Sequence, residues 1–156
     1  MRREPTSPDK STPTASSPAA RAVMRGNRSD SALERGLRSR LHRRGLRFRK
    51  HVNVVPGFRC KPDVVFTRAR LAVFVHGCFW HSCPDHRSQP KANDSWWRDK
   101  LANTVARDQR NRAALEAAGW TVVELWEHQD LDEMTDEVVA TLRGLQTAEV
   151  RPQAPD

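Results

Sequence analysis

The sequence lacks the long apolar segments that a membrane-spanning protein needs. Its longest purely apolar run covers residues 71–75, far short of the roughly 20 residues that cross a bilayer. No apolar stretch follows the basic N-terminal residues, so we expect no membrane association and no secretory signal. Cysteine is scarce, since the chain contains only Cys60, Cys78 and Cys83. An odd count with nearby histidines favours a metal site in a reducing cytoplasm over a disulfide framework.

Acidic residues are also in deficit. The chain has 19 Asp and Glu against 27 Lys and Arg, which gives a net charge of +8 and a pI near 10.4. This balance favours a polyanionic partner, with nucleic acid as the first candidate. A merely soluble basic protein is the alternative that the charge leaves open. At 156 residues the chain has room for one domain with a real core.

The N-terminal segment has almost no large apolar side chains. Residues 1–26 are rich in Ser, Thr, Pro, Ala and Arg, so we expect a disordered basic tail that cannot offset the entropy of ordering. Six basic and two acidic residues lie before position 29, so half of the net charge is in this region. The tail could contact phosphates or merely improve solubility. We expect a folded domain over residues 27–147 and a second disordered tail over 148–156.

The periodicity of the remaining chain predicts an α/β fold. A helix is expected to begin at residues 29–31, where Ser31 and Glu34 fit a capping box, and to end near Gly45. Strands are predicted over 48–55, 63–66, 71–75 and 120–126, and further helices over 94–118 and 131–145. The uniformly apolar strand 71–75 should lie in the centre of a mixed sheet flanked by helices. The predicted order is therefore α-β-β-β-α-β-α.

The most informative segment is residues 76–86, directly after the apolar strand. It carries Cys78, Cys83 and His86, whose side chains suit a tetrahedral zinc ion. A closed site needs a fourth ligand, and His128 is the best remaining donor because it follows the strand 120–126. Unligated buried cysteines beside surface histidines are the alternative. The adjacent aromatic residues Phe79 and Trp80 could wedge between stacked bases from this loop, or belong to the core.

Several segments in the same order resemble one family of DNA repair enzymes. They are residues 24–27, 33–34, 61–65, 76–81, 97–101, 105–108, 119–120 and 125–128. The chain resembles the very short patch repair endonucleases, which nick DNA beside a T·G mismatch left by deamination of 5-methylcytosine. The hexapeptide His-Gly-Cys-Phe-Trp-His at 76–81 is highly specific to that family. The resemblance implies a restriction-endonuclease-like fold with a structural zinc loop, in agreement with the predicted element order.

The resemblance also implies roles for individual residues in catalysis. Asp63 would bind magnesium together with the main-chain carbonyl of Val75, a position where family members commonly have threonine. His81 would be the general base, held by Asp108, since a neutral imidazole suits proton transfer near pH 7. The remaining catalytic candidates are His76, which would contact the scissile phosphate or leaving group, and Glu34, which would lie near the metal.

The residues themselves leave alternatives to these roles. Asp108 could instead pair with Arg112, four residues further along the same helix face. His76 could be a strand-end histidine satisfied by the backbone. Glu34 already has a structural explanation as the capping-box partner of Ser31.

The resemblance assigns DNA contacts to a further set of residues. The expected wedge consists of Phe79, Trp80 and Trp97, with Trp96 as a neighbour that could share the role, and the implied DNA contacts include Met24 and Arg25. The arginines at 107, 110 and 112 and the basic stretch 38–49 would contact phosphates, or simply form solvated faces. Cys60 has no evident partner.

The sequence and its resemblance together predict a metal-dependent endonuclease that nicks one strand beside a T·G mismatch, using catalytic Mg²⁺ and structural Zn²⁺. The alternatives are a zinc-stabilised DNA-binding protein that does not cut, and a nuclease of the same fold for other DNA structures. The expected partner is double-stranded DNA with the mismatch, with mismatch-repair proteins as further candidates. We expect a monomer in the bacterial cytoplasm, close to the nucleoid.

Overall fold

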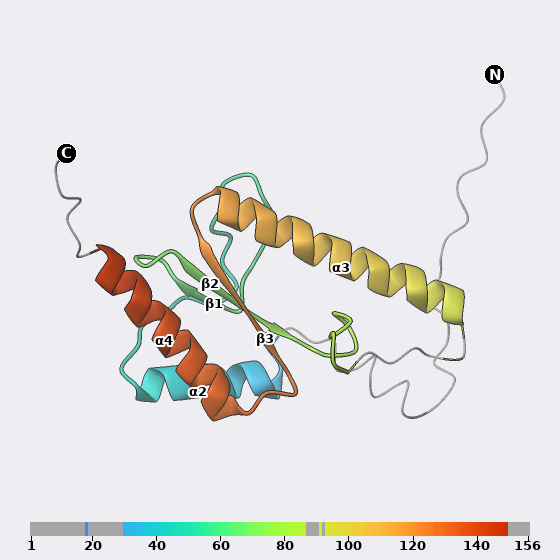
Figure 1. The fold of residues 1–156 in the computed structure, drawn as a ribbon, viewed down its shortest axis with the longest axis horizontal. Coiled ribbons are helices and arrows are strands. Elements are labelled where there is room, and N and C mark those ends of the chain that lie inside the picture. Colours follow the sequence, from blue (N-terminus) through green and yellow to red (C-terminus); the bar gives the residue numbers. More distant parts are fainter. Residues whose placement is uncertain (1–17, 19–29, 87–90, 92, 150–156) are drawn as a thin grey trace, which may run out of the picture.

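The computed structural model describes residues 18, 30–86, 91 and 93–149. The elements are α2 (Ala32–Arg43), β1 (Val64–Phe66), β2 (Leu71–His76), α3 (Asp94–Ala117), β3 (Thr121–Trp126) and α4 (Leu131–Glu149) (Figure 1). Most of the predicted N-terminal tail, including Met24 and Arg25, lies outside the described residues, as do residues 150–156. No helix in the described ranges is long and apolar enough to cross a membrane.

The three described strands form one mixed sheet in the order β1-β2-β3. β2 pairs antiparallel with β1, with Val73 opposite Val64, and parallel with β3, with Val73 opposite Val123. The predicted mixed sheet and the central position of the apolar strand are therefore confirmed. Because β2 and β3 are parallel, the residues that follow them meet at the same edge of the sheet.

The predicted strand over residues 48–55 is wrong. Among the described residues this segment makes only an isolated bridge, in which Arg49 and Val65 exchange backbone hydrogen bonds of 2.9 and 2.8 Å. His51 has a φ of +51°, and this left-handed conformation ends the extended run. The apolar character of Val54 and Val55 has another cause, because both pack against a core cluster that contains Leu115. The described order is therefore α-β-β-α-β-α.

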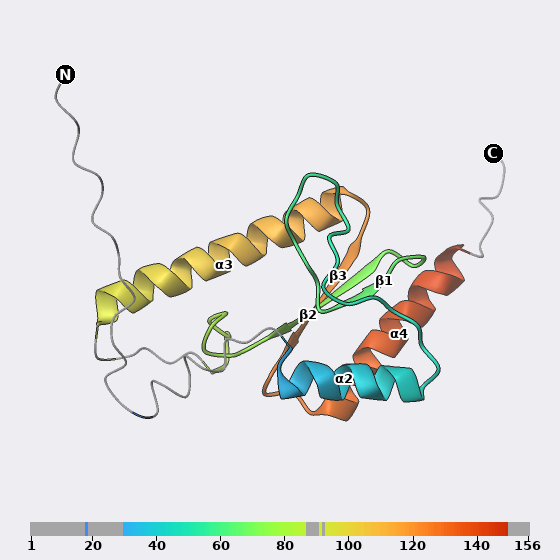
Figure 2. The ribbon, with the colours of Figure 1, turned by 180° about the vertical axis from the view of Figure 1, so that it is seen from behind.

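Helices cover both faces of the sheet (Figures 1 and 2). On one face Leu71 and Val73 pack in a cluster with side chains from α2 and α4, among them Leu37, Leu41, Met134 and Val138. On the other face Ala72 packs with Leu115 of α3 and with Cys60. Successive side chains of a strand point to opposite faces, so one central strand contributes to both clusters.

The helix ends follow the sequence signals. Ser31 and Glu34 form the predicted capping box, with hydrogen bonds of 3.2 and 3.3 Å between each side chain and the other residue's backbone N–H. After α3 the chain turns at Gly119, whose φ of +81° favours glycine. The Thr121 N–H then donates to the Arg70 carbonyl at 2.8 Å, which aligns β3 with β2. α4 extends to Glu149, beyond the predicted end at residue 145.

Candidate active site and metal centre

One cleft of about 980 Å³ collects side chains from distant parts of the chain. Its lining includes every residue to which the resemblance assigns a catalytic role, namely Glu34, Asp63, His76, His81 and Asp108. These come from the first turn of α2, the residue before β1, the end of β2, the following loop and the middle of α3. The sheet edge and α3 thus bring together residues that the sequence separates by up to 74 positions.

Asp63 lies immediately before β1 and is held by the backbone of β2. Its N–H donates to the Val73 carbonyl at 2.9 Å, and its Oδ2 accepts from the Val75 N–H at 2.8 Å. Val75 therefore lies directly beside this carboxylate in the cleft lining. Burial raises the pKa of Asp63, and the charge of Glu34 adds to this rise, although the hydrogen bond from Val75 opposes it. A divalent cation would stabilise the ionised form, so the position suits a hard metal ion.

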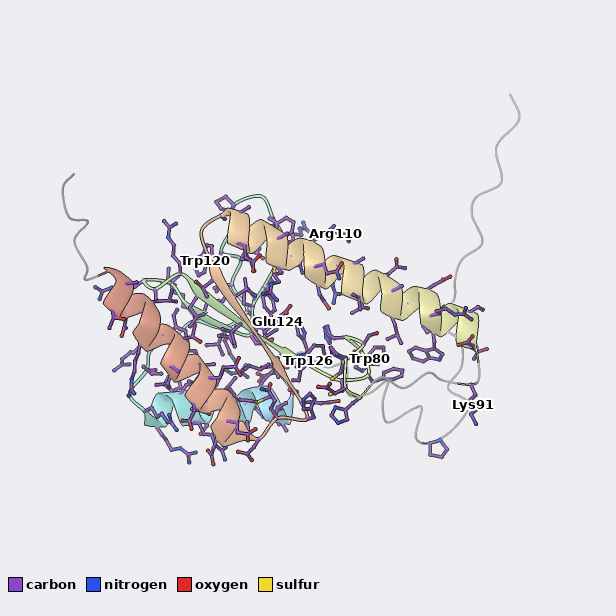
Figure 3. The ribbon with its side chains drawn as sticks, viewed as in Figure 1. Trp80, Lys91, Arg110, Trp120, Glu124 and Trp126 are labelled. Carbon is purple, nitrogen blue, oxygen red and sulfur yellow. The ribbon has the colours of Figure 1, made fainter. Side chains whose placement is uncertain are left out.

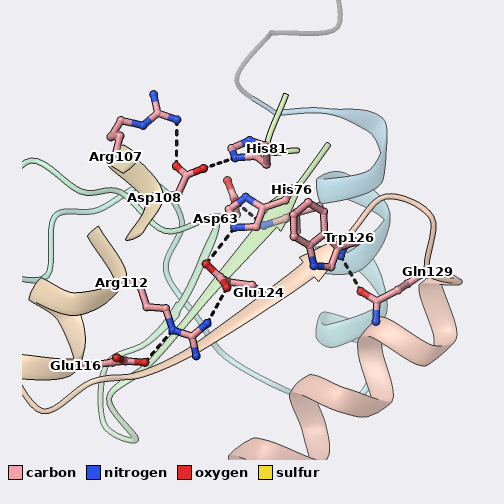
Figure 4. Close-up of polar contacts among 11 residues, drawn as sticks. Asp63, His76, His81, Arg107, Asp108, Arg112, Glu116, Glu124, Trp126 and Gln129 are labelled. Atoms are coloured by element: carbon pink, nitrogen blue, oxygen red, sulfur yellow. Dashed lines mark hydrogen bonds and ion pairs between the residues drawn. The ribbon is translucent and has the colours of Figure 1, made fainter. Parts of the chain in front are cut away.

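His81 pairs with Asp108, as the resemblance implied. The His81 Nδ1 lies 2.5 Å from the Asp108 Oδ2, and Arg107 donates to the other carboxylate oxygen at 3.2 Å (Figure 4). Burial works against ionisation of Asp108, but the hydrogen bond and charge of His81 outweigh it and lower the pKa of the carboxyl group. The alternative pairing of Asp108 with Arg112 is wrong, because Arg112 binds Glu116 and Glu124 at 2.9 and 2.8 Å.

His76 is buried at the end of β2, where its side chain is 7% exposed. Its ring lies 4.2 Å from the His81 ring and 5.2 Å from the Trp126 ring, measured between centroids. Its Nε2 lies 3.4 Å from the Glu124 Oε1 (Figure 4). The contact is therefore made to a side chain rather than to the backbone.

Glu124 is a site residue that the sequence reasoning missed. In β3 the neighbouring residues Val123 and Leu125 are buried in the core cluster with α2 and α4. Strand alternation places Glu124 on the opposite face, under α3. A charged residue between two buried apolar residues of a strand needs a partner on the opposite face of the sheet. This pattern was the signal in the sequence that could have identified Glu124.

Glu34 completes the predicted capping box and also lines the cleft. Its Oε1 completes the capping box, while its Oε2 lies 3.6 Å from the Arg38 guanidinium and 4.0 Å from the His51 Nε2. His51 also approaches Asp63, with 4.0 Å between Nδ1 and Oδ1. His51, which the sequence reasoning did not single out, thus lies between two carboxylates of the cleft.

The expected zinc ligands form a compact cluster. One donor atom from each of Cys78, Cys83, His86 and His128 lies within 4.8 Å of the others. The Nδ1 of His128 is 3.2 and 3.6 Å from the two sulfurs, and Cys83 Sγ is 3.8 Å from the Nδ1 of His86. A tetrahedral zinc with ordinary Zn–S and Zn–N bonds would place such atoms about 3.6 Å apart. The residues present therefore fit a structural zinc.

Electrostatics at this cluster also suit a cation. Burial and the neighbouring Cys83 raise the pKa of the Cys78 thiol to about 11. Two adjacent thiolates repel each other unless a positive charge lies between them, and a bound zinc ion would supply that charge. Glu127, another residue missed from sequence, accepts from the Cys78 N–H at 2.8 Å and ties the loop to the end of β3.

The expected DNA-wedge residues form one aromatic cluster. The rings of Phe79, Trp80 and Trp97 lie 5.2 to 5.7 Å apart. Trp97 is buried, whereas Phe79 and Trp80 are half-buried and line the catalytic cleft. Trp80 lies in the loop of residues 77–86, which carries Cys78, Cys83 and His86, under the N-terminal part of α3 (Figure 3). Trp97 thus supports two rings that remain accessible to a ligand, and Trp96 packs against it at 4.9 Å.

The remaining candidates differ in their surroundings. Arg107 lines the cleft beside Asp108, and Arg110 is exposed on α3 (Figure 3). Arg112 is committed to two carboxylates, which makes it a poorer phosphate contact than the other two. Cys60 is buried with Ala72 and lies outside the zinc-ligand cluster.

Comparison of the sequence with known proteins places the chain in a family. The sequence model described as DNA mismatch endonuclease Vsr matches residues 10–87, half of the chain. The chain is 42% identical to the type II nicking enzyme V.NaeI of Lentzea aerocolonigenes over 129 residues, which cover 81% of this chain and 78% of that protein. It is 34% identical to the DNA mismatch endonuclease Vsr of Escherichia coli K12 over 113 residues, 70% of each chain. Matches of this extent establish that the chain belongs to the Vsr family of DNA mismatch endonucleases.

Proposed function

We propose that the protein is a metal-dependent endonuclease that nicks one strand beside a T·G mismatch arising from deamination of 5-methylcytosine, in very short patch repair. The observation that carries this proposal is the convergence of Asp63, His81 and Asp108 on one cleft, beside half-buried aromatic rings. Carboxylates line this cleft although the protein as a whole is strongly basic, a combination that suits a divalent cation within a DNA-binding surface. Similarity to a mismatch endonuclease and to a nicking enzyme supports the same reaction.

In this mechanism Asp63 and the carbonyl of Val75 would hold Mg²⁺, which neutralises charge on the scissile phosphate when bound. His81 would accept a proton from the attacking water through Nε2, because Nδ1 is bound to Asp108. Asp108 fixes the tautomer and orientation of the imidazole and stabilises its protonated form. His76, whose ring contacts that of His81, would contact the phosphate or the leaving oxygen.

The aromatic cluster would recognise the distorted duplex. Insertion between base pairs costs a few kcal/mol of stacking energy, and the cost is lowest at a mismatch. Phe79 and Trp80 are accessible for this role, and buried Trp97 would hold them in place. The Cys and His cluster would bind Zn²⁺ and shape the loop that carries both rings.

We also propose a restriction-endonuclease-like fold, a domain covering residues 27–147, and action as a monomer in the bacterial cytoplasm close to the nucleoid. The partner would be duplex DNA with a T·G mismatch, and mismatch-repair proteins are further candidates. Retention of the His81–Asp108 pair favours a cutting enzyme over a DNA-binding protein without cleavage activity. The accessible aromatic rings favour a distorted duplex over an intact one.

The direct test is a nicking assay on duplexes with a T·G mismatch in randomised flanking sequence. We expect one-strand cleavage with magnesium, none with excess chelator, and little on the matched T·A duplexes. Sequencing of the products would identify the preferred flanks. Equal cleavage of matched and mismatched duplexes would contradict the proposed substrate, and cleavage in chelator would contradict metal dependence.

The Trp80→Ala variant tests the role of the aromatic cluster in mismatch recognition in the same assay. Removal of one ring should weaken the preference for T·G over T·A by about tenfold, because stacking against a base contributes about 1–3 kcal/mol. Trp120→Ala is a matched comparison, since Trp120 lies at the far end of α3 from the loop of residues 77–86 (Figure 3). If cleavage of both duplexes fell by the same factor in Trp80→Ala, Trp80 would be a structural residue.

The zinc content of the purified protein tests the proposed zinc ligands. The purified protein should contain about one zinc per chain, and Cys83→Ser should lose most of it and unfold at a lower temperature. Cys60→Ala is the matched control because Cys60 lies outside the ligand cluster, so this variant should keep its zinc. Zinc content and thermal unfolding can be measured on the same samples. Unchanged zinc in Cys83→Ser would contradict the ligand assignment.

A further inference from the structure

We propose that Glu124, clamped by Arg112, is a positioning residue for His76 in the nicking reaction. This inference rests on the proposed function and extends it to residues that act through His76. Glu124 does not line the catalytic cleft, so it has no direct access to the substrate there. Its effect would be exerted on the orientation and tautomer of the imidazole.

The contacts form a continuous chain of four side chains (Figure 4). The two carboxylate oxygens of Glu124 have separate partners, because Oε1 lies 3.4 Å from the His76 Nε2 and Oε2 accepts from Arg112 at 2.8 Å. Arg112 is held from its other side by Glu116, at 2.9 Å from its Nε. A carboxylate fixed at both oxygens has little rotational freedom, so it can fix the ring that it contacts.

The location of these groups explains why a carboxylate is stable there. The side chain of Glu124 is 25% exposed, so an unpaired charge would be costly. The hydrogen bond to His76 lowers the pKa of Glu124, and the charge of Arg112 adds to this effect although burial opposes it. Glu124 is therefore ionised at neutral pH and accepts a hydrogen bond from Nε2–H of the ring.

His76 lines two cavities, as do His81 and Asp108. One is the catalytic cleft with Asp63, and the other is a cavity of about 660 Å³ lined by Glu124 and Arg112. Because Glu124 binds Nε2, Nδ1 is the ring nitrogen of His76 that is left for a substrate group. His81 has the opposite arrangement, in which Nδ1 is bound to Asp108 and Nε2 is available. The two neighbouring rings are thus each oriented by their own carboxylate, through different nitrogens.

The first measurement is made on the full-length wild-type protein. Nitrogen chemical shifts of the histidine rings at one pH distinguish the Nε2–H tautomer from the Nδ1–H tautomer, and His76→Ala assigns the signal. We expect the Nε2–H form for His76, and a mixture of tautomers in Glu124→Leu. A dominant Nδ1–H form in the wild type would overturn the proposal whether or not the protein nicks DNA.

The second measurement is the single-turnover nicking rate on a T·G duplex. Loss of a residue that orients a functional histidine commonly costs 10- to 100-fold, so Glu124→Leu should slow nicking by about that factor. Glu124→Gln, which keeps an acceptor for Nε2–H, should recover part of this loss. Glu137→Gln is the matched control, since Glu137 is an exposed residue of α4 outside this chain of contacts, and it should nick at the wild-type rate.

A double-mutant comparison separates positioning from general destabilisation. If Glu124 acts through His76, Glu124→Leu should cause no further loss in a His76→Ala background. The same loss in both backgrounds, or an unchanged or faster rate in Glu124→Leu, would overturn the proposal. Absence of nicking by the wild type on every duplex would refute the proposed function instead, and the tautomer measurement would still decide the Glu124–His76 contact.

Discussion

Replacement of Asp63 by asparagine is expected to reduce magnesium-dependent nicking by at least about a thousandfold. A bound metal contributes several kcal/mol to transition-state stabilisation, and each 1.4 kcal/mol corresponds to about tenfold in rate. The amide oxygen of asparagine can still accept the Val75 N–H, so the local backbone should be preserved. The measurement is single-turnover nicking over a range of magnesium concentrations.

The same variant should bind mismatched duplex within a few-fold of the wild type, because the aromatic cluster and the basic side chains are unchanged. Asp136→Asn is a matched control, since Asp136 is an exposed residue of α4 paired with Arg44. It should nick normally. Undiminished cutting by Asp63→Asn would contradict the metal assignment, and lost binding would indicate a folding defect instead.

Asp63→Asn should also increase stability at neutral pH without magnesium. Burial raises the pKa of Asp63 above that of the unfolded chain, so the ionised carboxylate destabilises the folded state above the folded pKa. This cost is absent below the unfolded pKa near 4, where the group is protonated in both states. The stability gain of the variant should therefore appear as the pH rises through this window, which thermal unfolding at pH 3 and pH 7 would measure.

The second large effect is expected at the His81–Asp108 pair. His81→Ala should slow nicking by about 100- to 10,000-fold, the usual contribution of a general base. Asp108→Asn should also be severe, because an amide can stabilise the wrong tautomer of the imidazole. In a His81→Ala background Asp108→Asn should cost little more, since both residues act as one unit. Additive losses would show that Asp108 acts independently of His81.

The pair also predicts a pH dependence of stability. The pKa of Asp108 is lowered in the folded protein, so its ionised form stabilises the fold above the unfolded pKa. This stabilisation should be lost as the pH falls through the folded pKa, below about pH 4. The difference in unfolding temperature between wild type and Asp108→Asn should accordingly shrink in acid. A constant difference from pH 7 to pH 3 would contradict this assignment.

Sequence reasoning was most successful where the signal is local. The capping box at Ser31 and Glu34 and the central apolar strand were predicted and are observed, because each depends on neighbours a few residues away or on uniform burial. It failed over residues 48–55, where apolar residues indicated a strand. His51 adopts a left-handed conformation there, and the valines that follow it pack against the core cluster under α3.

By itself the sequence determined the chemical content of this protein. Residue types and their spacing identified the cysteines and histidines of the candidate zinc cluster and the aromatic pair beside them. They also revealed the resemblance to the family. Only the tertiary structure decided the pairing of acids with bases. Asp108 had two possible partners on spacing alone, and the packing of α3 on the sheet assigned it His81 and gave Arg112 to Glu124. Such choices depend on strand register and helix position, which bring into contact side chains that are 27 and 12 positions apart in the sequence. The local sequence contains no direct record of these contacts.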